Sequence, residues 1–465
     1  SPGDQSGLTS AATEEAARSR RALAILRLLG LFDRPATADW LTALWSGEAI
    51  PGLTEALVRV SDAQRNKALT RLQDAKLLTV NRDAAGALVS LDAHPLIREY
   101  FAVELKRRSG ELGFAGDISG TRQSAATNAW RAAHRRLYEH LCATTPDETQ
   151  PSLEDLQPLY QAVAHGCQAG LQEEAAVSIW WRRISRTEGY SVKKLGAFGA
   201  DLGALVFMFD VPWNKLSAAL SEGNAAGILQ HTSFNLRALG RLTEALEPMR
   251  LGLRMRVKQG NWKEAALSAN NLSELELTLG EVTGAVRDAE QSVTYADRSG
   301  DAFDSMDHRT LRADALHQTG RRSEAQTGFR KAEQMQVERQ PAYPLMYSIA
   351  GFRYCDLLLA APERAAWQII LGSAGVPPAV FGVLAENISG ARSHQHAPSP
   401  REEPVGGTPT GATGTVALPL IESCGAVSQR AAQTLKWVEA ARMDILSIAL
   451  DHLTLGRAAL YAAIL

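Results

Sequence analysis

The side chains best suited to catalysis or metal binding are four cysteines and ten histidines, and none stands at the spacing of a familiar motif. Cys142, Cys167, Cys355 and Cys424 form no CxxC pair, which disfavours a disulfide framework and indicates a reducing compartment. His165 lies two residues before Cys167, but a tetrahedral zinc ion needs four ligands. We therefore expect no metal site.

Signatures of catalysis are also missing from the sequence. It contains no HExxH, no GxSxG nucleophile turn and no GxGxxG after a strand. A phosphate-binding loop of the form GxxxxGK[ST] is absent because glycine is nowhere followed by lysine, and the glycine-rich run GGTPTGATGT lacks the lysine. These absences predict a protein that is not an enzyme and that needs no cofactor.

A repeat of 40 residues is the strongest pattern in the sequence. Its turn positions are Gly240, Gly280 and Gly320, with Gly260 and Gly300 at the half period. Five residues after each main glycine stand Ala245, Ala285 and Ala325, and one period further Ala360 and Ala365 continue the register. A glycine every 20 residues predicts helices of 14 to 16 residues joined by tight turns, and a small residue at a fixed offset allows close packing within each pair. Such pairs must stack into a solenoid to cover their apolar faces.

Polar side chains at three positions of each first helix are candidates for partner binding. The positions 10, 6 and 3 residues before the turn glycine should point toward the inner face of the stack. They are occupied by Gln230, Phe234 and Arg237, by Asn270, Glu274 and Leu277, and by Thr310, Asp314 and His317. The polar members of this set could bind a peptide backbone or its charged side chains. The alternative is that each is only a solvated polar residue.

The first hundred residues follow the order helix, helix, helix, hairpin, helix, which is typical of a winged-helix unit. Ser61 with Gln64 forms a capping-box signature for the third helix. Apolar strands at 77–80 and 87–91 flank the polar turn NRDAAG, and an amphipathic helix begins near Leu96.

Many winged helices bind DNA through the third helix, so that function is the alternative here. The helix offers four basic residues against two acidic ones. The residues are Arg65, Lys67, Arg71 and Lys76 against Asp62 and Asp74. The whole chain, with 49 Lys and Arg against 51 Asp and Glu, gives no overall electrostatic reason to bind nucleic acid or an anionic membrane.

The segment SANNLSELELTLGEVTGAVRDAEQSV resembles the tetratricopeptide repeat, in the form of about 40 residues found in kinesin light chains and in bacterial signalling ATPases. The resemblance covers roughly residues 155–366 and departs from the register between Ser191 and Glu222. It implies an α-solenoid that binds a protein or peptide partner. Asn270 and Asn271 match the paired asparagines of the kinesin-light-chain-like repeat and join the candidate groove.

The winged-helix segment, with LDAHPLIREYF at its last helix, is similar to the corresponding part of STAND-type signalling ATPases. In that family a histidine at the position of His94 contacts the phosphate of bound ADP, which implies a nucleotide-sensing role for His94 if an ATPase domain precedes this chain. The family's Met-His-Asp reads Ala93, His94, Pro95 here. The alternative is that His94 caps the helix that Pro95 starts.

These patterns predict a mainly α protein, a winged-helix unit followed by a tetratricopeptide-like α-solenoid. The expected segments are a winged-helix domain at 20–108, a helical linker at 109–152, helical repeats at 153–366 with no strands, a flexible low-complexity insertion at 367–425 and an incomplete terminal repeat at 426–465 whose partner helix lies beyond Leu465. The chain starts with Ser and ends within a helical pattern, so we expect a piece of a longer protein.

The function expected from these segments is a regulatory interaction module, the partner-sensing arm of a signalling ATPase, with DNA-binding transcription regulation as the alternative. Because no apolar run reaches the roughly 18 residues of a membrane span and no signal core follows the first residues, we expect a cytoplasmic protein with no membrane contact.

Overall fold

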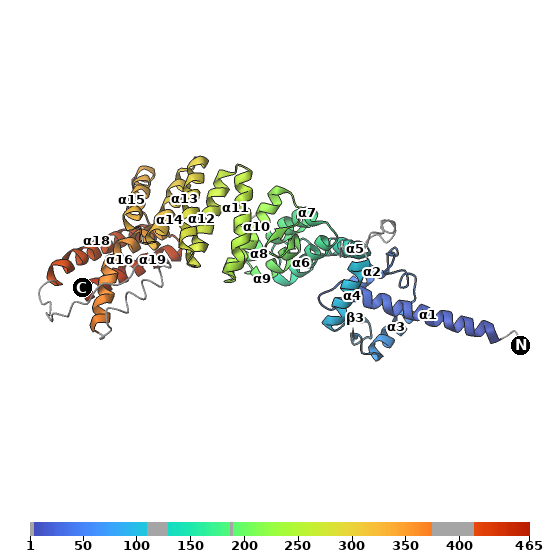
Figure 1. The fold of residues 1–465 in the computed structure, drawn as a ribbon. Coiled ribbons are helices and arrows are strands. Elements are labelled where there is room, and N and C mark those ends of the chain that lie inside the picture. Colours follow the sequence, from blue (N-terminus) through green and yellow to red (C-terminus); the bar gives the residue numbers. More distant parts are fainter. Residues whose placement is uncertain (1–3, 109–128, 187–188, 374–412) are drawn as a thin grey trace, which may run out of the picture. The chain divides into compact units, whose positions relative to one another are not determined.

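The computed structural model describes residues 4–108, 129–186, 189–373 and 413–465 (Figure 1). The chain divides into two compact units, residues 1–248 and residues 249–465. Both units are predominantly helical, which confirms the predicted fold class. In the described parts of the chain, no helix combines the length and the apolar character that crossing a bilayer requires.

The first unit opens with the element order predicted for a winged helix. The elements are α1 (Asp4–Leu29), β1 (Ala36–Thr37), α2 (Ala38–Trp45), α3 (Asp62–Asp74), β2 (Thr79–Arg82), β3 (Leu88–Asp92) and α4 (Pro95–Arg108). The three strands form an antiparallel sheet in the order β1-β3-β2. Leu28, Leu41, Leu44 and Leu91 are fully buried in the core that these elements share.

Local signals in the sequence explain how α3 and the wing begin and end. The Ser61 side chain accepts a hydrogen bond from the backbone N–H of Gln64, and the Gln64 side chain accepts from the backbone N–H of Ser61, as the predicted capping box requires. In the turn between β2 and β3, Asp83 Oδ1 accepts from the N–H groups of Ala85 and Ala87, and Gly86 has a φ of 83°.

The rest of the first unit is helical, with one hairpin. Its elements are α5 (Ala129–Thr144), α6 (Leu153–Gln168), α7 (Gln172–Glu174), the π-helical segment η1 (Ala175–Ser185), α8 (Tyr190–Lys193), α9 (Phe198–Leu205), the 3₁₀ turn η2 (Val206–Met208), β4 (Phe209–Val211), β5 (Lys215–Leu216), α10 (Glu222–Ala238) and the start of α11 (Leu242–Lys258). The expectation of no strands after residue 153 was wrong, because β4 and β5 pair around a turn at Pro212 and Trp213. Pro212 cannot continue a helix, and Trp213 adopts left-handed backbone with a φ of 61°. The chain therefore reverses direction at these two residues.

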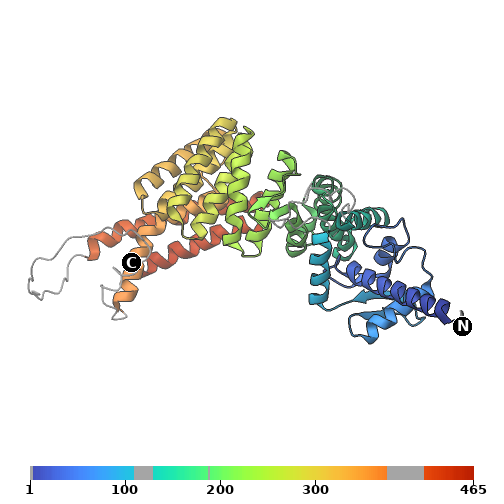
Figure 2. The same cartoon turned by 45° about the vertical axis from the view of Figure 1, so that its right-hand side comes forward.

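The second unit consists of antiparallel helices that stand side by side (Figures 1 and 2). They are the end of α11, α12 (Trp262–Thr278), α13 (Val282–Ser299), α14 (Ala302–Gln318), α15 (Arg322–Arg339), α16 (Ser348–Ser373), α18 (Thr413–Ala440) and α19 (Ile445–Ile464). The helices α12 to α15 are 17 or 18 residues long, slightly longer than the repeat predicted.

The predicted glycine turns are present in the form that the repeat required. Gly280 and Gly320 have φ values of 79° and 80°, the left-handed region that glycine adopts without steric cost. After Gly280 the backbone N–H of Glu281 donates to the carbonyl of Glu276 at 2.8 Å, which closes a Schellman cap. Ala285 has no exposed surface at the helix crossing, as the packing argument predicted.

The repeat register ends before Ala360. Helix α16 runs without a break from Ser348 to Ser373, although the sequence predicted a turn at Ala360. The physical reason is that left-handed backbone is sterically unfavourable for alanine. Ala360 therefore does not end the helix in the way that Gly280 and Gly320 end α12 and α14.

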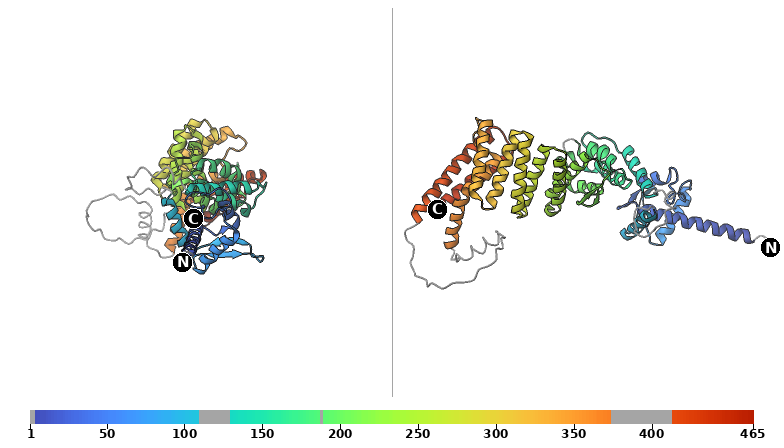
Figure 3. Two further views of the ribbon diagram at one scale, coloured as in Figure 1. Left: turned by 90° about the vertical axis from the view of Figure 1, so that its right-hand side faces the viewer. Right: turned by 45° about the horizontal axis from the view of Figure 1, so that its top comes forward.

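Helices α16, α18 and α19 pack against one another, as the orange and red ribbons of Figure 3 show. Cys355, Cys424 and Tyr461 share their buried core. α19 therefore has a partner, α18, within the chain, whereas the sequence placed that partner beyond Leu465. α16 includes residues 367–373 and α18 includes residues 413–425, so both ends of the predicted flexible insertion are helical. The remainder of that insertion and the start of the predicted linker lie outside the described residues.

Candidate functional site

The groove residues predicted in the second unit lie on two first helices of the repeats. Asn270, Asn271 and Glu274 belong to α12, and Asp314 and His317 belong to α14. We call the surface formed by these five residues, together with Asp307 on α14, the inner face. The other two predicted groove residues, Gln230 and Arg237, lie on α10 of the first unit. Gln230 is exposed and Arg237 is half-buried.

The inner face holds a guanidinium group from the same chain. Arg353 on α16 donates from Nη2 to Glu274 Oε1 at 2.5 Å, and its Nε lies 3.4 Å from Asp314 Oδ2. The side chains of Arg353, Glu274 and Asp314 are 19%, 30% and 15% exposed, so this ion pair network is only partly solvated. Charge-assisted bonds of this kind are stronger than those at a fully exposed surface.

Asp307 adds a third carboxylate to this cluster. Burial raises the pKa of Asp307, although the nearby His308 and Arg353 lower it in part. Burial likewise raises the pKa of Asp314 against the opposing effect of Arg353. Glu274, Asp307 and Asp314 thus place three carboxyl groups near the guanidinium of Arg353.

A second ion-pair network continues the inner face toward α19. His317 Nε2 lies 3.5 Å from Asp356 Oδ2, and Arg457 Nη2 lies 2.8 Å from Asp356 Oδ1 and 3.0 Å from Glu363 Oε2. Burial acts to raise the pKa of Asp356, but the hydrogen bonds from His317 and Arg457 outweigh it and leave that pKa lowered. The Tyr461 hydroxyl donates to Glu363 Oε1 at 2.6 Å.

The paired asparagines differ in their surroundings. Asn270 is 7% exposed, and its Oδ1 has no hydrogen-bond partner in the described part of the chain, whereas Asn271 is half-buried. Leaving a buried amide oxygen unpaired costs free energy.

Sequence reasoning missed Arg353, Asp356 and Arg457. All three lie beyond the last glycine turn, on helices whose repeat register had already ended, so no spacing assigned them to the inner face. Only the packing of α16 and α19 places them there.

His94 caps the N-terminus of α4. Its carbonyl accepts from the N–H of Ile97 at 2.8 Å, its Nδ1 accepts from the N–H of Leu96 at 3.3 Å, and the residue is exposed. This geometry matches the alternative interpretation, in which His94 caps the helix that Pro95 starts. The nucleotide-sensing role stays a prediction.

Two of the four basic residues predicted to face DNA, Arg65 and Arg71, are engaged with other side chains. Arg65 pairs with Asp62 and lies over the ring of Trp45, at 5.5 Å from its centroid. Arg71 pairs with Glu15 of α1 at 2.6 Å. A DNA backbone would have to displace these partners, which weakens the electrostatic argument for DNA binding.

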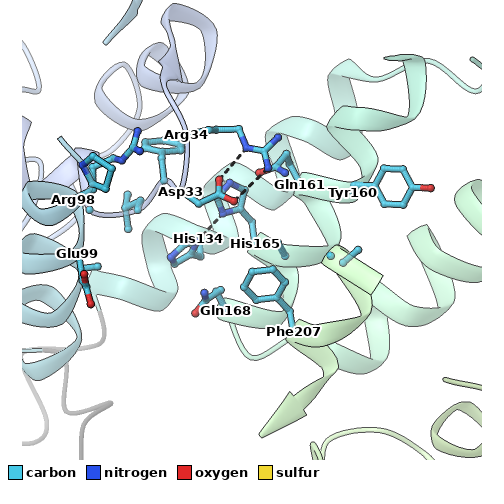
Figure 4. A pocket seen from close by; sticks show the side chains of 18 of the residues that line it. Asp33, Arg34, Arg98, Glu99, His134, Tyr160, Gln161, His165, Gln168 and Phe207 are labelled. Carbon is cyan, nitrogen blue, oxygen red and sulfur yellow. Dashed lines mark hydrogen bonds and ion pairs between the residues drawn. The ribbon is translucent and has the colours of Figure 1, made fainter. Parts of the chain in front are cut away.

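A cavity of about 700 Å³ lies in the first unit (Figure 4). Its walls come from the loop after α1 and from α4, α5, α6 and α9 with η2. The main polar and aromatic wall residues are Asp33, Arg34, Arg98, Glu99, Lys106, Trp130, His134, Gln157, Tyr160, Gln161, His165, Gln168 and Phe207.

Two buried histidines lie at the centre of Figure 4. His134 on α5 and His165 on α6 are 1% and 5% exposed, and their Nδ1 atoms are 2.7 Å apart. Burial lowers the pKa of His165 to about 4 and lowers that of His134 well below its ordinary value. Both rings are therefore neutral near pH 7.

His165 thus hydrogen-bonds to a histidine and forms no ligand set with Cys167. Burial raises the pKa of the Cys167 thiol to about 12, so this sulfur is a poor metal ligand and a poor nucleophile. Within the described ranges, no group of three or more His, Cys, Asp or Glu side chains is arranged to hold a metal ion.

A buried carboxylate stands behind the cavity wall. Tyr160 donates from its hydroxyl to Asp201 Oδ1 at 2.7 Å, and Ser191 donates to Oδ2 at 2.9 Å. Burial raises the pKa of Asp201 to about 6, although these hydrogen bonds oppose the shift. The contacts join α6 and α8 to α9 beside the cavity.

No protein-family model matches the chain, and none of the curated proteins does. Among solved structures, the chain is similar to a Signal Transduction ATPase with Numerous Domains (STAND) protein with a tetratricopeptide repeat sensor, from Pyrococcus horikoshii. The identity is 12% and the TM-score is 0.23, over 92% of this chain and 65% of that chain. This chain therefore spans less than two thirds of that chain's length.

Proposed function

We propose that the chain is a non-enzymatic regulatory module that binds a protein or peptide partner on the inner face of its helical repeats. The observation that carries the proposal is the position of Arg353, whose guanidinium is held by Glu274 and Asp314. The bound guanidinium indicates the chemistry that this surface accepts, and the carboxylate of Asp307 adds further negative charge. A partner segment with an exposed arginine or lysine fits it best.

Fluorescence anisotropy with two labelled peptides of equal length, one containing arginine and one containing glutamate at the same positions, tests the proposal. We expect the arginine peptide to bind and the glutamate peptide not to bind. Glu274→Gln and Asp314→Asn should each weaken binding about tenfold, the effect of losing one charged contact of ~1.4 kcal/mol. Arg353→Ala should tighten binding because it removes the guanidinium that competes with the partner for Glu274 and Asp314.

Glu290→Gln on α13 is the matched control. Glu290 also forms an ion pair, with Arg312 at 3.4 Å, but it lies outside the inner face. Equal binding of both peptides, or equal effects of the Glu274 and Glu290 variants, would contradict the proposal.

The finer part of the proposal is that this module is the cytoplasmic, partner-sensing arm of a signalling ATPase. Its support is the resemblance of the sequence around His94 and of the repeats to that family. The first measurement is the intact mass of the native protein and the ADP or ATP released when it is denatured. A mass near that of this chain, with no released nucleotide, would refute the proposal that the module belongs to a signalling ATPase. The proposal of partner binding would then be tested by the peptide assay alone.

A further inference from the structure

The histidine pair has one hydrogen-bond donor and one acceptor that no described residue uses, both buried within the cavity wall. For two neutral rings joined through Nδ1, one ring carries its proton on Nδ1 and the other carries it on Nε2. The first ring then has a free acceptor at Nε2 and the second has a free donor. Neither Nε2 has a hydrogen-bond partner among the residues that the structure describes.

Three glutamines on one face of α6 extend this set of neutral polar groups. Gln157, Gln161 and Gln168 all line the cavity and are half-buried. Within the described residues, no hydrogen bond engages their side-chain amides. Each amide offers two donor hydrogens and one acceptor oxygen.

The charged groups at the cavity are mostly matched by partners. Arg34 binds Asp33 at 2.9 Å, Arg98 binds Asp92 at 2.6 Å, and Lys106 lies 4.5 Å from the centroid of the Trp130 ring. On α5 and α6 the unused hydrogen-bonding capacity is therefore neutral, carried by amides and imidazoles, whereas Glu99 on α4 adds an exposed carboxylate to the lining.

Trp130 and Phe207 supply aromatic surface, and a volume of about 700 Å³ lies in the range of small-molecule sites. We propose that this cavity binds a small neutral molecule rich in hydroxyl groups, of the size of a monosaccharide or disaccharide, through Gln157, Gln161 and Gln168. The site is independent of the inner face. Its ligand would contact α4 of the winged helix and α6 of the following helices together.

The cavity can be filled at a position that tolerates a side chain. Gly203 lies in α9 and lines the cavity, and a Cβ atom built there meets nothing within 4 Å. We expect Gly203→Leu to block the site and Gly203→Ala to leave it open. Gly199→Leu is a second filling variant, since Gly199 also lines the cavity and has open space around its Cβ position.

Saturation-transfer NMR and calorimetry with the full chain test the proposal. The probes are glucose, sucrose, lactose and inositol, with citrate and inorganic phosphate as charged counterparts. We expect at least one neutral probe to bind, and Gln161→Ala, Gln168→Ala and both leucine variants to weaken its binding by about tenfold or more. Gly203→Ala and Gly223→Leu, an exposed position at the start of α10, should stay within about twofold of the unmodified chain.

Each other outcome overturns the proposal. If no probe binds, or if only citrate or phosphate binds, the cavity does not take this class of ligand. If a neutral probe binds equally well to the leucine and glutamine variants, its site lies elsewhere. Far-UV circular dichroism and thermal melting distinguish a blocked cavity from an unfolded variant.

Discussion

His134 and His165 are joined by a hydrogen bond of 2.7 Å between their Nδ1 atoms, across 31 residues of sequence. The pair connects α5 to α6 inside the first unit and is almost inaccessible to solvent. A shared proton between two Nδ1 atoms requires at least one ring to be neutral, so the contact depends on pH.

Acid should therefore destabilise the first unit. Burial lowers the pKa of His165 to about 4, below the value of about 6.5 expected in the unfolded chain. The unfolded state then binds more protons, so the stabilising contribution is complete above pH 6.5 and decreases as the pH falls toward 4. For His165 alone the loss should reach about 2 kcal/mol at pH 5.

Urea unfolding of the full chain at pH 7 and pH 5, followed by tryptophan fluorescence, measures this loss. His165→Gln should be less stable at pH 7 but should show a smaller decrease at pH 5. An exposed control, His452→Gln, should leave the decrease unchanged, since His452 is far less buried on α19. An unfolding free energy equal at both pH values would refute the prediction.

The glycine turns should be sensitive to a single methyl group. Gly280→Ala places a Cβ on backbone with a φ of 79°, and should reduce the unfolding free energy of the second unit by about 1–2 kcal/mol. Gly456→Ala is the control, because Gly456 is exposed within α19 and its added Cβ meets nothing within 4 Å. That variant should be as stable as the parent chain or up to about 1 kcal/mol more stable. Thermal denaturation of both variants provides the comparison.

Ala285 should tolerate no larger side chain. Its surface is completely buried where the helices of a pair cross, so Ala285→Leu should cost about 1–3 kcal/mol by forcing α13 away from its neighbour. Ala302→Leu, at an exposed position that begins α14, should change stability by less than about 0.5 kcal/mol. Similar losses for both variants in chemical denaturation would show that close packing at Ala285 is unimportant.

Arg353 and Glu274 should be energetically coupled. A double-mutant cycle of Arg353→Ala and Glu274→Gln isolates their interaction, which should fall between about 0.5 and 3 kcal/mol for a partly buried ion pair. A parallel cycle of Arg353→Ala with Glu290→Gln should give a coupling near zero. Denaturant titration of the four chains in each cycle measures both values, and a coupling near zero for the first pair would contradict the contact.

The sequence predicted those parts of the fold that depend on local chemistry. The glycines determine the turns, Ala285 allows the close helix crossing, and Ser61 with Gln64 begins α3. Each of these features depends on a few residues that are close in sequence. The hairpin at Pro212 and Trp213 was missed because its strands are too short to produce an alternating pattern.

The candidate sites depend on contacts between distant segments and were only partly predictable. The helical period placed Glu274 and Asp314 on one face, but nothing local indicated that Arg353 would reach them from α16. Gln157, Gln161 and Gln168 share a helical face that the sequence could have revealed. The cavity that these glutamines line is completed by α4, α5 and α9, and no sequence pattern indicated that those helices would pack around it.

The identical left-handed turns at Gly280 and Gly320 make the second unit modular in a strict sense. Removing residues 281–320 would rejoin α12 to α15 through the same turn, so that a first helix would again be followed by a second helix in phase. Removing only residues 281–300 would join α12 to α14, which are both first helices of a pair. The apolar face of every helix beyond the junction would then point toward the wrong neighbour. Insertions and deletions in this region are therefore restricted to whole helical pairs, because Gly260, Gly280, Gly300 and Gly320, all with positive φ, fix the turns between successive helices.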